Sequence, residues 1–124
     1  VKHIYNGALL KDIFAEEDEQ IQLVSGLDHP FALPAGHDNA GFLYDQNSGR
    51  FLIFKTEAPC FVVYTANFVD ESVIIGGRPM VQHNGIALEA QALPDAIHSD
   101  LKDQVILKAG QTFTSKTRYE LVVK

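Results

Sequence analysis

Glu89 is the acidic residue of this sequence whose surroundings most suggest chemistry. It lies in residues 86–93, an apolar run that a Pro-Asp pair ends and in which Gln91 is the only other polar residue. With the two-residue period of a strand, Ala87, Glu89 and Gln91 share one face, and the opposite face carries Ile86, Leu88, Ala90 and Ala92. Such a strand either faces water or lines a cleft. In a cleft, partial removal of water disfavours a charged carboxylate and makes it a stronger base.

Several short elements occur in a characteristic order around this strand. Residues 83–96 contain H-x-G-x-x-L-E-x-Q followed by P-D-A, and L-x-x-G follows at residues 107–110. Upstream, residues 28–31 are D-H-P-F and residues 64–68 are Y-T-A-N-F. Together these elements resemble the pattern of the aldose 1-epimerases, or galactose mutarotases, and their order makes the match more specific than any one motif. The resemblance covers nearly the whole chain but only the C-terminal part of such an enzyme.

The resemblance implies an isomerase of carbohydrate metabolism that interconverts the α and β anomers of a hexose, galactose or glucose. A base removes the proton of the anomeric hydroxyl while an acid protonates the ring oxygen, and the ring opens. Glu89 matches the base of the family and Asp28 its sugar-binding acid. Tyr64 is a further candidate for the sugar site through its ring, with packing in the core as the alternative. The reaction needs no cofactor and no metal.

Two departures from the family pattern bear on whether this chain can act alone. The general-acid histidine of the family, with a second histidine and an arginine of its site, belongs to the preceding part of such proteins. Many members also carry a glutamine two residues before the motif tyrosine, where this sequence has Val62. We therefore expect residues 1–124 to form a single region, the C-terminal part of an aldose 1-epimerase domain. Val1, which is not an initiator methionine, favours a fragment whose N-terminal part is missing.

Other candidate residues have a simpler structural interpretation. Asp28 precedes a His-Pro pair and could be a turn residue, and His29 and His83 are expected to support the motifs that contain them. Cys60 is expected to be a small buried residue, and Arg78 a solvated residue of a glycine-rich loop. Three further histidines are expected in loops or at the surface, without a role: His3, His37 and His98.

Composition limits the class of protein. Of 124 residues, 46% are hydrophobic and 21% charged, which is ordinary for a globular domain. The net charge of −6 argues against nucleic acid or an anionic membrane as partner, since both need a cationic surface. A single cysteine excludes an internal disulfide, and the apolar runs are too short to span a bilayer. We therefore expect a cytoplasmic location.

The remaining pattern predicts an all-β, antiparallel fold. Turn residues separate short apolar runs, and the predicted strands cover residues 20–24, 31–33, 41–44, 50–56, 61–64, 86–93, 104–107 and 112–123. Residues 41–56 indicate a hairpin with a five-residue loop. Helical turns are predicted only within residues 8–19 and 95–101. The resemblance implies that this β-sandwich is part of a larger galactose-mutarotase-like β-supersandwich.

Two rival functions stay open at the level of sequence. The chain could be a non-catalytic carbohydrate-binding β-sandwich, because no residue matches the general acid of the family. It could also be an inactive half-domain that needs the missing N-terminal part of the enzyme before it binds anything. A homodimer is a further arrangement to test.

Overall fold

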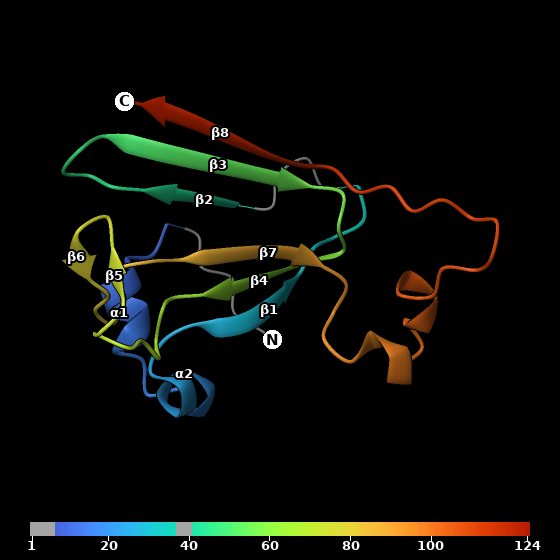
Figure 1. Cartoon of the computed structure of the whole chain (residues 1–124), viewed down its shortest axis with the longest axis horizontal. Helices are drawn as coiled ribbons and strands as arrows, with labels where there is room; N and C mark the ends of the chain where they lie inside the picture. The colour runs from blue at the N-terminus through green and yellow to red at the C-terminus, as the bar shows by residue number, and fades with distance from the viewer. Residues whose placement is uncertain (1–6, 37–40) are drawn as a thin grey trace. The chain divides into compact units, whose positions relative to one another are not determined.

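The computed structural model of the chain describes residues 7–36 and 41–124 (Figure 1). In chain order the elements are α1 (Leu10–Phe14), α2 (Glu19–Val24), β1 (Asp28–Ala32), β2 (Gly41–Tyr44), β3 (Arg50–Thr56), β4 (Cys60–Tyr64), β5 (Ile74–Ile75), β6 (Arg78–Pro79), β7 (Ala87–Gln91), the 3-10 helices η1 (Ala96–His98) and η2 (Lys102–Gln104), and β8 (Thr117–Val123). The strands form three sheets, ordered β1-β4-β7, β2-β3-β8 and β5-β6. This mostly antiparallel arrangement confirms the predicted all-β class.

The described residues divide into two compact units. The first contains the described residues up to Phe31 together with Val62–Glu89, and the second contains those from Ala32 to Phe61 together with Ala90–Lys124. Asp28, Tyr64 and Glu89 all belong to the first unit. A single region over residues 1–124 stays a prediction.

The core of the first unit forms where the two short helices pack on the first strand. Its buried residues are Ile13 of α1, Ile21 of α2 and Leu27, and the partly buried residues packed against them are Leu10, Phe14, Phe31 and Val63. The helical turn predicted within residues 8–19 is confirmed by α1. Because Leu27 and Phe31 point into this core, Asp28 of β1 points to the opposite face.

The prediction of a strand at residues 20–24 is wrong, because these residues form α2. The Asp18 carboxylate accepts hydrogen bonds from the backbone N–H groups of Gln20 (2.8 Å) and Ile21 (3.4 Å), which caps the helix. Ile21 is buried, whereas Leu23 is 73% exposed, so the apolar residues do not share the face that a strand would give them. The N-cap therefore outweighs a pattern that only suggests alternation.

A two-residue turn closes a small hairpin between β5 and β6. Ile75 pairs with Arg78, and Gly76 and Gly77 between them have φ of 59° and 77°. Positive φ at both central positions is the requirement of the type I′ hairpin turn, which favours glycine. Arg78 is exposed, as predicted, but it lies in a strand rather than a loop.

The second unit is organised around the β2-β3 hairpin, which confirms the prediction for residues 41–56. Tyr44 pairs with Phe51 at the closed end of the hairpin, and β3 pairs antiparallel with β8 on its other side. Phe54 of β3 lies against Phe61 of β4, with ring centroids 4.9 Å apart. Side chains of two different sheets therefore meet in this unit, as they do in a β-sandwich.

The last strand is shorter than predicted, and one predicted strand is wrong. Residues 102–104 form η2, and residues 105–107 are exposed and form no strand. β8 begins at Thr117 rather than at residue 112 because it pairs with Thr56, the last residue of β3. A strand extends only as far as its partner supplies hydrogen bonds. Strands predicted at residues 31–33, 61–64 and 86–93 are confirmed with shifted bounds, and η1 confirms the turn within residues 95–101.

Within residues 7–36 and 41–124, no helix is long and apolar enough to cross a membrane. In the same part of the chain, no three His, Cys, Asp or Glu side chains gather as a set of metal ligands.

Candidate functional site

The three site residues predicted from the sequence lie on the three strands of one sheet. Asp28 is the first residue of β1, Tyr64 the last of β4 and Glu89 the middle residue of β7. The sheet order places β4 between β1 and β7 (Figure 1). The side chains of Asp28 and Glu89 are exposed, and that of Tyr64 is half-buried. The strands that carry the two carboxylates therefore lie on either side of the strand that carries Tyr64.

Asp28 and Tyr64 are neighbours across the sheet. The backbone N–H of Thr65 donates to the carbonyl of Leu27 at 3.0 Å, and β4 runs antiparallel to β1 (Figure 1). One step along each strand places Asp28 opposite Tyr64, with Cα atoms about 5 Å apart and both side chains on one face. Leu27 and Thr65 point to the other face, and both are buried. Asp28 and Tyr64 thus share the face opposite Leu27 and Thr65, on which Val62, farther back along β4, is buried.

Glu89 lies on a strand whose two faces differ, as the sequence pattern predicted. Ala87 and Glu89 are exposed, whereas Leu88 between them is half-buried. Because side chains alternate along a strand, Glu89 and Ala87 point to the open face of β7. A carboxylate on a strand has a well-defined position, which a general base needs.

The hydroxyl of Tyr64 holds the loop that follows β4. It accepts a hydrogen bond from the Phe68 backbone N–H at 2.9 Å and donates to the Phe68 carbonyl at 3.1 Å. The ring rather than the hydroxyl is therefore the part of Tyr64 that can meet a sugar. Phe61, on the same strand, is 1% exposed and belongs to the core.

The two motif histidines support the backbone beside the candidate site. His29 is buried, and its Nδ1 accepts a hydrogen bond from the Asp28 N–H at 3.0 Å. His83 Nδ1 lies 3.0 Å from the Thr65 carbonyl, and its ring stacks on Phe14 with centroids 4.1 Å apart. Because a carbonyl only accepts, this nitrogen of His83 carries the proton. Both contacts agree with the structural interpretation of these histidines.

An open pocket lies beyond the end of β4, and two of its lining residues, Asn67 and Phe68, belong to the Y-T-A-N-F motif. It has a volume of about 580 Å³ and is lined by Asn67, Phe68, Val69, Asp70, Glu71 and Gln82. Hydrogen bonds from Ser72 hold the pKa of Asp70 below its usual range, so this carboxylate stays charged at neutral pH. Carboxylate and amide groups can bind the hydroxyl groups of a small polar molecule. Asp70 and Glu71 belong to no matched motif, and sequence reasoning missed them.

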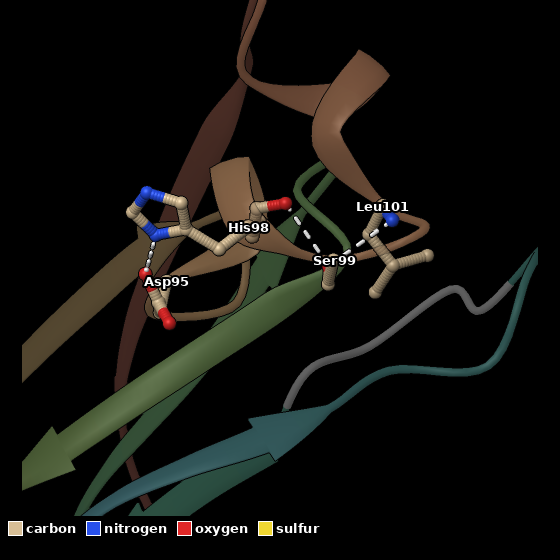
Figure 2. Close-up of polar contacts among 5 residues, drawn as sticks. Asp95, His98, Ser99 and Leu101 are labelled. Carbon is tan, nitrogen blue, oxygen red and sulfur yellow. Dashed lines mark hydrogen bonds and ion pairs between the residues drawn. The ribbon is translucent and has the colours of Figure 1, made fainter.

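Asp95 and His98 form a hydrogen-bonded pair after β7, at the P-D-A element. Figure 2 shows the Asp95 carboxylate turned toward the ring of His98, and Nδ1 of the ring is hydrogen-bonded to it. The Ser99 hydroxyl donates to the Ala96 carbonyl and accepts from the Leu101 N–H (Figure 2). Ser99 is thus engaged with backbone rather than with His98, so the three side chains do not form a nucleophilic triad. They stabilise the turn around η1, and His98 is exposed as predicted.

Two further residues singled out in the sequence, Cys60 and Val62, are buried. Cys60 is fully buried, which confirms its interpretation as a small core residue. Val62 is 7% exposed and packs in the sheet at the position where many aldose 1-epimerases carry a glutamine. His3 and His37 lie outside the described residues.

Comparison with known proteins decides the family. Residues 7–120 match the sequence model of the family described as Aldose 1-epimerase. The chain belongs to this family. Its relatives include galactose mutarotase of Bos taurus, 31% identical over 103 residues, and aldose 1-epimerase of Escherichia coli K12, 29% identical over 116 residues. These alignments cover 81% and 90% of this chain but 30% and 33% of the relatives.

A solved structure confirms the fold. The chain is similar to galactose 1-epimerase from Lactobacillus acidophilus NCFM, with a TM-score of 0.63 and 35% sequence identity. The match covers 89% of this chain and 30% of that protein. The galactose-mutarotase-like β fold predicted from the sequence is therefore confirmed for the part of the fold that the chain spans, about a third of the length of the relatives.

Proposed function

We propose that this chain supplies the base and a sugar-binding carboxylate of an aldose 1-epimerase that interconverts the α and β anomers of galactose or glucose. The observation that carries the proposal is the place of three motif residues on three neighbouring strands of one sheet. Asp28, Tyr64 and Glu89 come from motifs of the family, and β4 lies between the strands of the two carboxylates. Membership of the aldose 1-epimerase family supports the reaction class.

The exposure of Asp28 and Glu89 supports a shared site for the two carboxylates. The helices cover the face to which Leu27 points, and the more exposed residues of β1 and β7 include Asp28 and Glu89. When one face of a sheet packs against helices, the exposed side chains of neighbouring strands gather on the other face. Adjacent strands lie about 4.8 Å apart, so β1 and β7 are separated by about 10 Å. A sugar over β4 would lie between them.

The proposed reaction moves two protons. The Glu89 carboxylate takes the proton of the anomeric hydroxyl, an acid protonates the ring oxygen, and the bond between the anomeric carbon and the ring oxygen breaks. Rotation about the bond between C1 and C2 presents the other face of the aldehyde, and reversal of both proton transfers closes the ring. Asp28 accepts hydrogen bonds from sugar hydroxyls, and the Tyr64 ring faces the C–H side of the sugar. The acid comes from residues outside this chain.

Replacing Glu89 by glutamine tests the assignment of the base. In the protein as its gene encodes it, Glu89→Gln keeps the shape and hydrogen-bonding capacity of the side chain but cannot accept the proton. We expect turnover to fall by roughly two to four orders of magnitude while the affinity for galactose stays within about threefold. Polarimetry of freshly dissolved α-galactose measures the rate, and calorimetry measures binding. Glu57→Gln, at an exposed glutamate of the second unit, is the matched control. Near-normal mutarotation in the Glu89 variant would refute the assignment.

A second candidate is a half-domain that acts only when further protein covers it. Leu121 and Val123 of β8 are 79% and 77% exposed, yet the β3-β8 register places them on the same face as buried Phe54. An apolar strand face in water favours association. Sedimentation of the 124-residue chain, with Leu121→Glu as comparison, tests this candidate together with calorimetry on galactose. Concentration-dependent association without sugar binding supports it. A monomeric chain that binds galactose contradicts this candidate. If that monomer also lacks mutarotase activity, the result supports a non-catalytic carbohydrate-binding β-sandwich.

The proposed partners follow from the proposed reaction. They are a hexose and the remaining part of the enzyme fold, and a homodimer would appear in the same sedimentation experiment. We propose a cytoplasmic location, which fractionation of the source cells would test. A single cysteine that lies fully buried in a strand supports it.

A further inference from the structure

A buried polar cluster joins the residue before Asp28 to the residues after Tyr64. The Leu27 N–H donates to Thr65 Oγ1 at 2.9 Å, and the Leu27 carbonyl accepts from the Asn67 amide nitrogen at 2.8 Å. That carbonyl also accepts from the Thr65 backbone N–H at 3.0 Å. Leu27, Thr65 and Asn67 are 4%, 1% and 4% exposed. Both hydrogen-bonding groups of the Leu27 backbone are therefore held by one two-residue pair, Thr65 and Asn67.

The hydrogen bonds of this pair have a defined direction. Thr65 Oγ1 lies 2.7 Å from Asn67 Oδ1 and 3.4 Å from the Leu27 carbonyl, so its one proton goes to Asn67. Asn67 Oδ1 is then the acceptor, and its amide nitrogen is the donor toward Leu27. Exchange of that nitrogen for an oxygen would turn a hydrogen bond into the repulsion of two acceptors inside the protein.

Gly26 leaves the room that the cluster needs. Its φ is +147°, and a Cβ atom at this position would lie 2.3 Å from Asn67 Oδ1 and 2.8 Å from Thr65 Oγ1. Any side chain here would displace the pair. The glycine before Leu27 and the Thr-Ala-Asn segment after Tyr64 are therefore parts of one arrangement, although they lie about forty residues apart.

The same turn also holds the segment that leads to β7. The Ala66 carbonyl accepts from the His83 N–H at 3.1 Å, and the Thr65 carbonyl is bonded to His83 Nδ1. Gln82 donates its side-chain amide to the Asn67 carbonyl at 3.1 Å. The contact with Leu27 is made by the two side chains together with the Thr65 backbone N–H, whereas the contact with residues 82–83 is made by backbone carbonyls alone. Substitution of the side chains therefore perturbs the Asp28 side of the site more than the Glu89 side.

We infer that Thr65 and Asn67 are positioning residues that hold the Asp28 carboxylate in place for the sugar. They act through the Leu27 backbone, which fixes where β1 begins and which face Asp28 occupies. The inference rests on the proposed function, because it assigns a consequence for sugar binding to a buried cluster. It predicts a specific kinetic pattern: loss of the cluster weakens sugar binding, while proton transfer by Glu89 continues.

The test uses near-isosteric variants in the protein as its gene encodes it. Asn67→Asp puts an oxygen against the Leu27 carbonyl, Thr65→Val removes the hydroxyl, and Thr65→Ser keeps it. We expect the first two to raise KM for galactose about tenfold with kcat within about threefold, and Thr65→Ser to stay within about twofold of the parent. Asn47→Asp and Thr112→Val, at exposed positions of the second unit, are the matched controls and should change neither constant.

The outcomes separate the inference from the proposed function. A parent protein that neither binds galactose nor accelerates its mutarotation overturns both. An active parent whose Asn67→Asp and Thr65→Val variants lose only thermal stability, with unchanged KM, overturns the inference alone. Equal behaviour of Thr65→Ser and Thr65→Val also overturns it. If Asn67→Asp does not fold, the serine and valine variants at position 65 give the same comparison.

Discussion

Replacing Tyr64 by phenylalanine separates the two roles that a site tyrosine could have. The hydroxyl of Tyr64 makes two hydrogen bonds to the backbone of Phe68, at 2.9 Å and 3.1 Å. Its one proton is used in the bond to the Phe68 carbonyl. If the ring alone faces the sugar, removing the hydroxyl costs stability but little affinity. Both bonds are exposed to solvent, so each contributes at the low end of the usual range. We expect Tyr64→Phe to lower the free energy of unfolding by about 1 kcal/mol.

Two measurements on the same variant check this reasoning. Urea denaturation gives the change in stability, and polarimetry gives KM and kcat for galactose. We expect both kinetic constants within about threefold of the parent, because the hydroxyl is occupied by the loop rather than by substrate. Tyr64→Ala, which also removes the ring, should raise KM further. A tenfold rise in KM for Tyr64→Phe, with unchanged stability, would show that the hydroxyl contacts the sugar and would refute the assignment.

Two further predictions concern a glycine and a surface carboxylate. Gly26→Ala should lower the free energy of unfolding by about 2–4 kcal/mol in urea denaturation, because the new Cβ meets Asn67 and the backbone has positive φ. Gly36→Ala, whose Cβ would lie in open space, is the control. Equal effects of the two substitutions would contradict the close contact between Gly26 and Asn67. The hydrogen bond from Ser48, followed by that from the Asn47 backbone, holds the pKa of Asp45 below its usual range. Such a group stabilises the fold above its unfolded pKa, near 4, and the contribution is lost as pH falls through the folded pKa. Ser48→Ala should therefore raise the pKa of Asp45 in an NMR titration. It should reduce stability most above about pH 4, and this reduction should disappear as pH falls through the folded pKa. An unchanged titration would contradict the role of Ser48.

Local signals in the sequence predicted most of the β structure and gave two wrong strands, at residues 20–24 and 104–107. The hairpin of β2 and β3 was predictable because five turn residues separate two apolar runs. The prediction of a strand at residues 20–24 is wrong because the alternation there is weak, whereas the Asp18 carboxylate caps α2. The Gly-Gly pair at residues 76–77 is a hairpin signal, whereas the prediction for Arg78 is a loop. In each case a capping or turn residue carried the information that the hydrophobic pattern lacked.

The ends of the strands in the second unit could not be predicted, because they depend on distant partners. Residues 105–107 are apolar enough for a strand, yet they are exposed and pair with no strand among the described residues. β8 begins where β3 ends, through the pairing of Thr117 with Thr56. Such pairing joins residues about sixty positions apart, and no local pattern encodes it.

The candidate site was predictable as a set of residues but not as a geometry. The motif resemblance selected Asp28, Tyr64 and Glu89, and alternation predicted that Glu89 faces away from the apolar side of β7. The neighbouring positions of Asp28 and Tyr64 follow only from the hydrogen bond between Thr65 and Leu27. Two further features depend on the folded loop. They are the hydrogen bonds between the Tyr64 hydroxyl and Phe68, and the acidic wall of the pocket at residues 70–71.

The structure of the whole protein with galactose bound tests the central claim most directly. We predict that the Glu89 carboxylate lies about 2.6–3.2 Å from the anomeric oxygen, as a general base requires, and that Asp28 accepts a hydrogen bond from another hydroxyl of the same sugar. A sugar bound elsewhere, with the side chain of Glu89 surrounded by water, would contradict the claim.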